Sequence, residues 1–109
     1  MPTGEILMIH VIATIEVKPG KRDAFLAEFH RIVPLVHAEV GCIEYGPSVD
    51  VASGLSMQGP LRETVVVIIE KWESVAALKG HTHAPHMAEY RVAVQDLVVG
   101  VTLQILAPA

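Results

Sequence analysis

The chain has 109 residues, the length of a single domain, and we expect one domain spanning residues 1–109. Hydrophobic residues make up 51% of the chain and charged residues only 18%, an apolar balance for a small protein whose surface is large relative to its volume. The net charge is −4 and Lys and Arg together number 8, so the sequence argues against a nucleic-acid partner.

The apolar excess indicates either a membrane segment or surface that is buried against a second subunit. The longest apolar stretch, Ile6 to Ile15, is interrupted by His10 and has about half the length that spans a bilayer. Residues 1–5 lack the basic region of a signal peptide. Cys42 is the only cysteine, which excludes an internal disulfide and is typical of a reducing compartment. We therefore expect a cytoplasmic homodimer with no membrane partner.

Four segments have the composition of β-strands: Met8 to Val17, Cys42 to Val51, Thr64 to Glu73 and Val99 to Leu106. In the second strand, Gly46-Pro47 indicates an edge strand or a bulge. In the third, Val65 to Ile69 is continuously apolar, which predicts that both faces are buried. Helices can cover only one face of so small a sheet, so the other face is expected to need a second subunit.

Apolar residues follow helical spacing from Lys21 to about Glu39, and Gly41 suits a left-handed cap after that helix. Ser74 can cap a short second helix, and Pro85 falls near the first turn of a third. The segment Ala52 to Glu63 has turn residues and no period, which predicts a long hairpin loop. The element order is β-α-β-β-α-β with a split second helical region, the ferredoxin-like arrangement of an antiparallel α+β sheet.

Three segments of the chain form a pattern: a strand ending in Val17-Lys18-Pro19-Gly20-Lys21, the segment His37 to Tyr45 with its Glu39-Val40-Gly41-Cys42, and Glu70-Lys71-Trp72-Glu73-Ser74 followed by His81 and Ala84-Pro85-His86. Together they resemble the antibiotic biosynthesis monooxygenase family, which includes quinol monooxygenases and cofactor-free oxidases of polyketide aromatics. The resemblance covers about Ile9 to Val98. It implies a dimeric α/β barrel in which two sheets face each other, although the Ala52 to Glu63 loop is longer than the family usually carries.

The resemblance also implies a reaction. A dihydroxyarene loses a proton and then reduces O₂ directly, so no cofactor is needed, and the protein binds the phenolate and excludes water. His81 and His86 are expected to transfer protons or to form hydrogen bonds in a pocket, because neutral imidazole acts as a base near pH 7. Trp72 is expected to line an aromatic pocket and donate one hydrogen bond. The residues expected to contact the substrate are Tyr45, Glu70, His10 and Tyr90.

Each of these residues also has a structural interpretation. His81 and His86 could cap the helix break before Met87, and Trp72 could anchor the core under the helices. Tyr45 could pack on its strand, and His10 could be a satisfied sheet histidine.

Other functions fit parts of the sequence. The cluster of His81, His83 and His86 suggests a metal, but Pro85 disfavours a continuous helix and no His-Glu-x-x-His pattern is present, so we expect none. Haem degradation is disfavoured because Ala13 stands where that branch of the family has Asn. A non-catalytic ligand-binding or stress-response barrel and a lactone isomerase remain as alternatives, because the fold alone does not settle the function.

Overall fold

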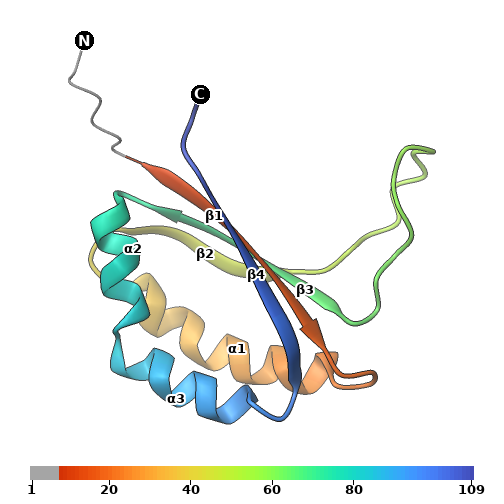
Figure 1. The fold of residues 1–109 in the computed structure, drawn as a ribbon, viewed down its shortest axis with the longest axis horizontal. Coiled ribbons are helices and arrows are strands. Elements are labelled where there is room, and N and C mark those ends of the chain that lie inside the picture. The colour runs from red at the N-terminus through yellow and green to blue at the C-terminus, as the bar shows by residue number, and fades with distance from the viewer. Residues whose placement is uncertain (1–7) are drawn as a thin grey trace.

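The computed structural model describes residues 8–109, which form four strands and three helices (Figure 1). The strands are β1 (Ile9–Val17), β2 (Cys42–Ser48), β3 (Val65–Trp72) and β4 (Val98–Leu106). The helices are α1 (Arg22–His37), α2 (Val75–Thr82) and α3 (Pro85–Val94). The predicted ferredoxin-like order is confirmed, including the split second helical region. Residues 1–5, from which the sequence predicts no signal peptide, lie outside the described residues, as does the start of the apolar stretch at Ile6.

The sheet is antiparallel throughout and has the strand order β2-β3-β1-β4. At its centre, Ala13 of β1 lies opposite Ile68 of β3 on one side and Leu103 of β4 on the other. Directly opposed residues point to the same face of a sheet, so these three side chains share a face. β2 is an edge strand, as predicted, but its register shift falls between Cys42 and Glu44 rather than at Gly46-Pro47.

Local signals set the helix boundaries. The Ser74 hydroxyl accepts a hydrogen bond of 3.1 Å from the backbone N–H of Ala77 and caps α2, as predicted. Pro85 is the first residue of α3, where its missing N–H costs nothing. No helix within residues 8–109 is long and apolar enough to cross a membrane.

All three helices lie on one side of the sheet (Figure 1). The alternate residues of β1 that face them are buried, and so are the side chains of α1 that pack against the sheet. The largest fully buried side chains of this core are Trp72, Phe25, Phe29, Ile9, Ile68, Val11, Val17, Val36 and Val66. The core therefore lies between one face of the sheet and the helices.

The other face of the sheet is only partly covered within one chain. Ile12 and Val67 are half-buried there, and Ile69 is 44% exposed. The helices cover one face of Val65 to Ile69, as predicted, because all of them lie on that side of the sheet (Figure 1); burial of the other face by a second subunit stays a prediction. An apolar sheet face is left open.

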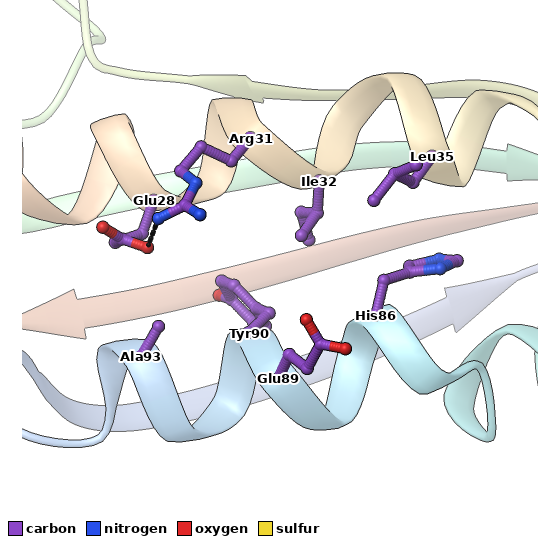
Figure 2. A pocket seen from close by; sticks show the side chains of 8 residues that line it. All are labelled: Glu28, Arg31, Ile32, Leu35, His86, Glu89, Tyr90 and Ala93. Atoms are coloured by element: carbon purple, nitrogen blue, oxygen red, sulfur yellow. Dashed lines mark hydrogen bonds and ion pairs between the residues drawn. The ribbon is translucent and has the colours of Figure 1, made fainter.

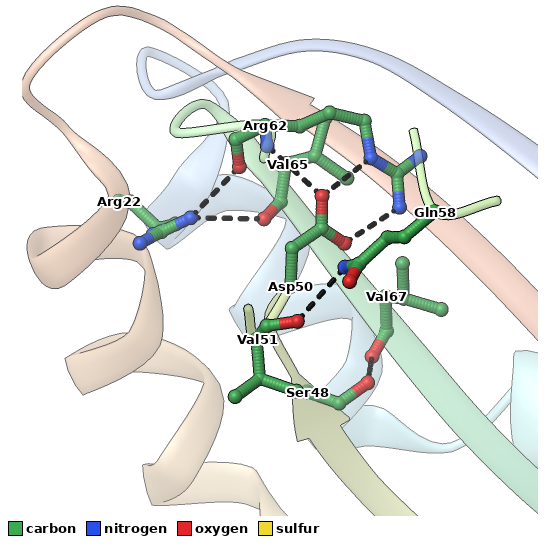
Figure 3. A network of polar contacts seen from close by, with 8 residues as sticks. All are labelled: Arg22, Ser48, Asp50, Val51, Gln58, Arg62, Val65 and Val67. Carbon is green, nitrogen blue, oxygen red and sulfur yellow. Dashed lines mark hydrogen bonds and ion pairs between the residues drawn. The ribbon is translucent and has the colours of Figure 1, made fainter. Parts of the chain in front are cut away.

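The connection from β2 to β3 forms an arm that extends away from the sheet (Figure 1). A double hydrogen bond ties its base together, from Arg62 Nε to Asp50 Oδ2 and from Arg62 Nη2 to Asp50 Oδ1, each 2.8 Å (Figure 3). These bonds lower the pKa of Asp50 to about 2. Arg22 of α1 donates to the carbonyl of Arg62 at 3.0 Å, which joins the arm to the body. The predicted long loop is thus an ordered hairpin, with Met57 96% exposed.

Candidate functional site

A cavity of about 490 Å³ lies between the covered face of the sheet and the helices. Its walls are mostly apolar. The strand residues that line it are Val11, Ala13, Ile15, Tyr45, Ile68, Glu70, Val101, Leu103 and Ile105. The helix residues that line it are Phe29, Val75, Leu78, Lys79, His81, Thr82, Met87, Tyr90 and Arg91. An apolar hollow with a few polar groups is the usual form of a small-molecule site.

The open wall of this cavity comes from β4. The side chains of Val101, Leu103 and Ile105 point to the same face as the core residues of β1, yet they are 54%, 58% and 50% exposed. The helices come closest to the sheet at β2 and β3, so the same face of β4 remains accessible. The space left above β4 is the hollow into which a ligand can enter.

His81 is the polar group most firmly placed at this cavity. It lies in the last turn of α2 and is only 5% exposed. Its ring packs against Trp72, with ring centroids 4.8 Å apart, and against Tyr45 at 5.3 Å. Its Nδ1 lies 3.0 Å from Oε2 of Glu39, and its Nε2 has no hydrogen-bond partner within residues 8–109. The geometry leaves one ring nitrogen available for chemistry.

Glu70 of β3 also lines the cavity and is 6% exposed. Burial raises its pKa from 4.5 to about 7, and the negative charge of Glu39 adds to the rise. A hydrogen bond of 2.9 Å from Trp72 Nε1 to Glu70 Oε1 acts in the opposite direction. Near neutral pH, Glu70 is therefore present both as a proton donor and as a carboxylate.

Two tyrosines also line the cavity. Burial raises the pKa of the Tyr45 hydroxyl and of the Tyr90 hydroxyl above the ordinary value, and the charge of Glu70 adds to both shifts. Both hydroxyls therefore stay protonated at neutral pH. Phe29 holds them in place, since it stacks on Tyr45 with centroids 5.3 Å apart and meets Tyr90 edge-on at 5.7 Å.

Trp72 does not line the cavity wall. It is fully buried behind the cavity, where it supports His81 through ring packing and Glu70 through its hydrogen bond. The expected hydrogen bond from its indole is present, but the expectation that Trp72 lines the pocket is wrong, because the side chain is fully buried in the core.

His86 does not line this cavity. Its Nε2 is 2.6 Å from Oε2 of Glu39. It lines a separate groove of about 250 Å³ between α1 and α3, where its ring lies toward Leu35 (Figure 2). The structure thus brings His81 and His86 to one carboxylate, but only His81 to the cavity.

His10 is not part of this site. It is half-buried on the open face of the sheet, because it alternates with the core residues Ile9 and Val11. His83 is exposed just beyond α2. In the part of the chain that the structure describes, no group of three His, Cys, Asp or Glu side chains is arranged to hold a metal ion.

Glu39 is the site residue that sequence reasoning did not identify. It occurred only as the acidic member of the Glu39-Val40-Gly41-Cys42 pattern. Its partners lie 42 and 47 residues away along the chain, so no local spacing relates them. The sequence signal that could have identified Glu39 is that the same family pattern contains this acidic residue and the two histidines.

Comparisons with known proteins agree on one family. The sequence profile of the family described as "Antibiotic biosynthesis monooxygenase" matches residues 8–93. A protein of Escherichia coli named "Probable quinol monooxygenase YgiN" is 44% identical over 103 residues, which cover 93% of this chain and 98% of that protein.

Solved structures agree as well. The crystal structure of PA3566 from Pseudomonas aeruginosa has a TM-score of 0.78 and 25% identity, covering 97% of this chain and 99% of that one. The structure of Rv0793 from Mycobacterium tuberculosis has a TM-score of 0.76 and 27% identity, covering 94% and 95%.

Proposed function

Because this chain belongs to the antibiotic biosynthesis monooxygenase family, we propose that this monooxygenase oxidises a quinol or a polycyclic phenol with O₂ and needs no cofactor. The observation that carries the proposal is the placement of His81, a buried imidazole at the wall of an apolar cavity, one nitrogen of which has no hydrogen-bond partner among residues 8–109. The name of the E. coli relative supports a quinol as the substrate class.

The first step is the removal of a proton from a substrate hydroxyl by Nε2 of His81. The resulting phenolate is electron-rich, and its ring carbon passes electrons to O₂. One oxygen atom becomes bonded to the ring and the other leaves as water, so a quinol and O₂ give a hydroxylated quinone and H₂O. The low polarity of the cavity strengthens every electrostatic contact to the phenolate and keeps bulk water away.

Glu70 and Tyr45 are proposed to bind the oxygens of the substrate. Glu70 carries a proton for part of the time near pH 7, and the Tyr45 hydroxyl stays protonated, so both can donate hydrogen bonds to a developing phenolate or carbonyl oxygen. Tyr90 lines the same cavity and is proposed to contact the ring. Trp72 is proposed to act from behind, by keeping Glu70 and His81 in position.

The cavity volume supports a substrate of one to three fused rings. A volume of about 490 Å³ lies within the range of roughly 300–1,000 Å³ that is typical of small-molecule sites. Aromatic side chains from Phe29, Tyr45 and Tyr90 offer faces and edges on which a planar ring can stack.

We also propose that the protein works as a homodimer in the cytoplasm. The open sheet face carries Ile12, Val67 and Ile69, which a second copy would bury. Cys42 is free, which suits a reducing compartment.

The test is oxygen uptake by purified, metal-stripped protein against a panel of quinols and anthrones. Uptake above autoxidation that falls strongly in His81→Ala, but not in the matched control His83→Ala, is the expected result. The control removes an exposed histidine two residues away. No uptake above background with any substrate would overturn the proposal and favour a ligand-binding role.

A further inference from the structure

Glu39 and the two histidines around it form one hydrogen-bonded unit. The Oε2 atom of Glu39 lies 3.0 Å from Nδ1 of His81 and 2.6 Å from Nε2 of His86. The three side chains are 12%, 6% and 20% exposed, so the unit is largely removed from solvent. Hydrogen bonds to a carboxylate are about twice as strong as neutral ones, and burial strengthens them further.

We propose that Glu39 is a positioning residue for His81, and that His86 in turn fixes Glu39. This inference rests on the proposed role of His81 as the base. Glu39 itself does not line the cavity, so it acts through the imidazole and not on the substrate.

The argument begins with the tautomer of His81. An ionised carboxylate only accepts hydrogen bonds, so the His81 nitrogen that faces it must carry the hydrogen. With the hydrogen on Nδ1, the lone pair of a neutral ring is on Nε2, the nitrogen to which no other described residue bonds. Without Glu39 the neutral ring would exchange between two tautomers, and only one of them could accept a proton at Nε2.

Charge provides the second step. When His81 takes a proton from the substrate, the ring becomes a cation, and the carboxylate of Glu39 at 3.0 Å stabilises it. The same negative charge contributes to the raised pKa of Glu70. Glu39 therefore favours both partners of the reaction, the base that gains a proton and the acid that keeps one.

The fold holds Glu39 rigidly. It lies in the turn after α1, where its N–H donates to the carbonyl of Val36 at 2.9 Å and its carbonyl accepts from Cys42 N–H at 3.2 Å. Gly41 closes this turn with a φ of +83°. A Cβ at Gly41 would come within 2.5 Å of the Cβ of Ala77, so α2 packs directly on the turn. This close packing brings His81 to Glu39.

His86 restrains the carboxylate from the other side. Its side chain reaches Glu39 from the first turn of α3, and its ring borders the groove between α1 and α3 (Figure 2). A carboxylate held by two donors has little freedom to rotate away from either of them. This assigns His86 to the support of Glu39, in contrast to a direct proton transfer with the substrate.

The test compares Glu39→Gln with the matched control Glu89→Gln on the full chain. Glu89 lines the same groove as His86 and is exposed, so the control makes the same chemical change beside the unit. ¹⁵N NMR of the histidine rings in mildly alkaline buffer, without any substrate, reports which nitrogen carries the hydrogen. In the unsubstituted protein and in Glu89→Gln, we expect the His81 ring to carry its hydrogen on Nδ1. In Glu39→Gln, we expect a mixture of the two His81 tautomers.

Kinetics with the best quinol from the oxygen-uptake panel provide the second readout. We expect kcat of Glu39→Gln to fall roughly 100-fold with KM changed less than about twofold, because the base is impaired and the cavity is not. For His86→Gln we expect kcat to fall about tenfold and His81 to keep the same tautomer, because His86 supports Glu39 from outside the cavity. An unchanged His81 tautomer in Glu39→Gln would overturn the inference. A changed tautomer in a protein that oxidises no quinol would overturn the proposed reaction and leave the positioning role standing.

Discussion

Trp72 Nε1 donates a hydrogen bond of 2.9 Å to Glu70 Oε1, from the same face of β3 two residues away. The bond stabilises the ionised carboxylate, whereas burial of both residues destabilises it, and the balance raises the pKa of Glu70 to about 7. Trp72 is the only tryptophan in the chain. Its fluorescence therefore reports on the ionisation of a group at the cavity wall.

The first prediction concerns the pH dependence of stability. Between pH 4.5 and about 7, Glu70 ionises in the unfolded chain but keeps its proton in the folded one, so stability falls as pH rises through this window. The full effect is about 3 kcal/mol, at about 1.4 kcal/mol for each pKa unit. Glu70→Gln should remove this part of the pH dependence and be more stable than the parent above pH 7. Urea unfolding at several pH values, followed by Trp72 fluorescence, measures it.

Glu44→Gln is the control for that experiment, because Glu44 is an exposed carboxyl on the neighbouring strand β2, paired with Lys71. The stability of Glu44→Gln should still fall as pH rises from 4.5 to about 7. If Glu70→Gln retains the same slope as the control, the buried carboxyl is not the group responsible.

The second prediction concerns the contact between Gly41 and Ala77. Gly41→Ala should destabilise the fold by about 3 kcal/mol, because the new methyl group is strained at φ +83° and also meets the Cβ of Ala77. Gly54→Ala is the matched control, since Gly54 has a φ of +81° but open space around it, and should cost only about 1 kcal/mol. Thermal and urea unfolding compare the two. Equal losses would mean that α2 moves aside without cost.

The third prediction concerns the open face of the sheet. Ile69→Lys should convert a dimer into a monomer, because a charge would be buried at the centre of the proposed interface. Val92→Lys changes an exposed valine on α3, on the helical side of the molecule, and should leave the dimer intact. Equilibrium sedimentation distinguishes the two. A monomeric parent protein would rule out this interface.

The fourth prediction concerns the wall formed by β4. Leu103→Trp should fill part of the cavity and weaken binding of 1,4-naphthoquinone, a probe with the shape of the proposed product, by at least about tenfold. Leu103 is 58% exposed, so the larger ring can enter the hollow without crowding the core. Calorimetric titration measures the affinity, with Val92→Trp as a control that adds the same ring elsewhere. Unchanged binding would place the ligand outside this cavity.

Much of the fold could be predicted from the sequence because the signals are local. Buried and less buried side chains alternate along β1 because successive residues of a strand point to opposite faces. The starts of α2 and α3 are set by Ser74 and Pro85, which stand at those positions in the sequence. Where the sequence could not decide, the reason is tertiary. Val65 to Ile69 is apolar throughout, but the composition of a strand does not say whether its second face is covered by the same chain or left open.

The candidate site divides in the same way. Residue type and family pattern singled out four residues, and the structure places His81, Glu70 and Tyr45 on the wall of one cavity, with Trp72 in contact with them. The pattern did not separate His10 from this group, because the face on which a strand residue lies depends on where the helices pack. His86 was grouped with His81 by spacing, yet Glu39 stands between them.

The sequence by itself determined the element order, the fold class, the family and the chemical types available to the site, because each depends on neighbouring residues or on a pattern shared along the chain. Only the tertiary structure decided that Glu39 joins His81 and His86, that Trp72 supports the cavity from behind, and that Glu70 titrates near pH 7. These properties depend on burial and on contacts between residues tens of positions apart. Only the packing of α2 and α3 against the sheet and the turn after α1 creates them.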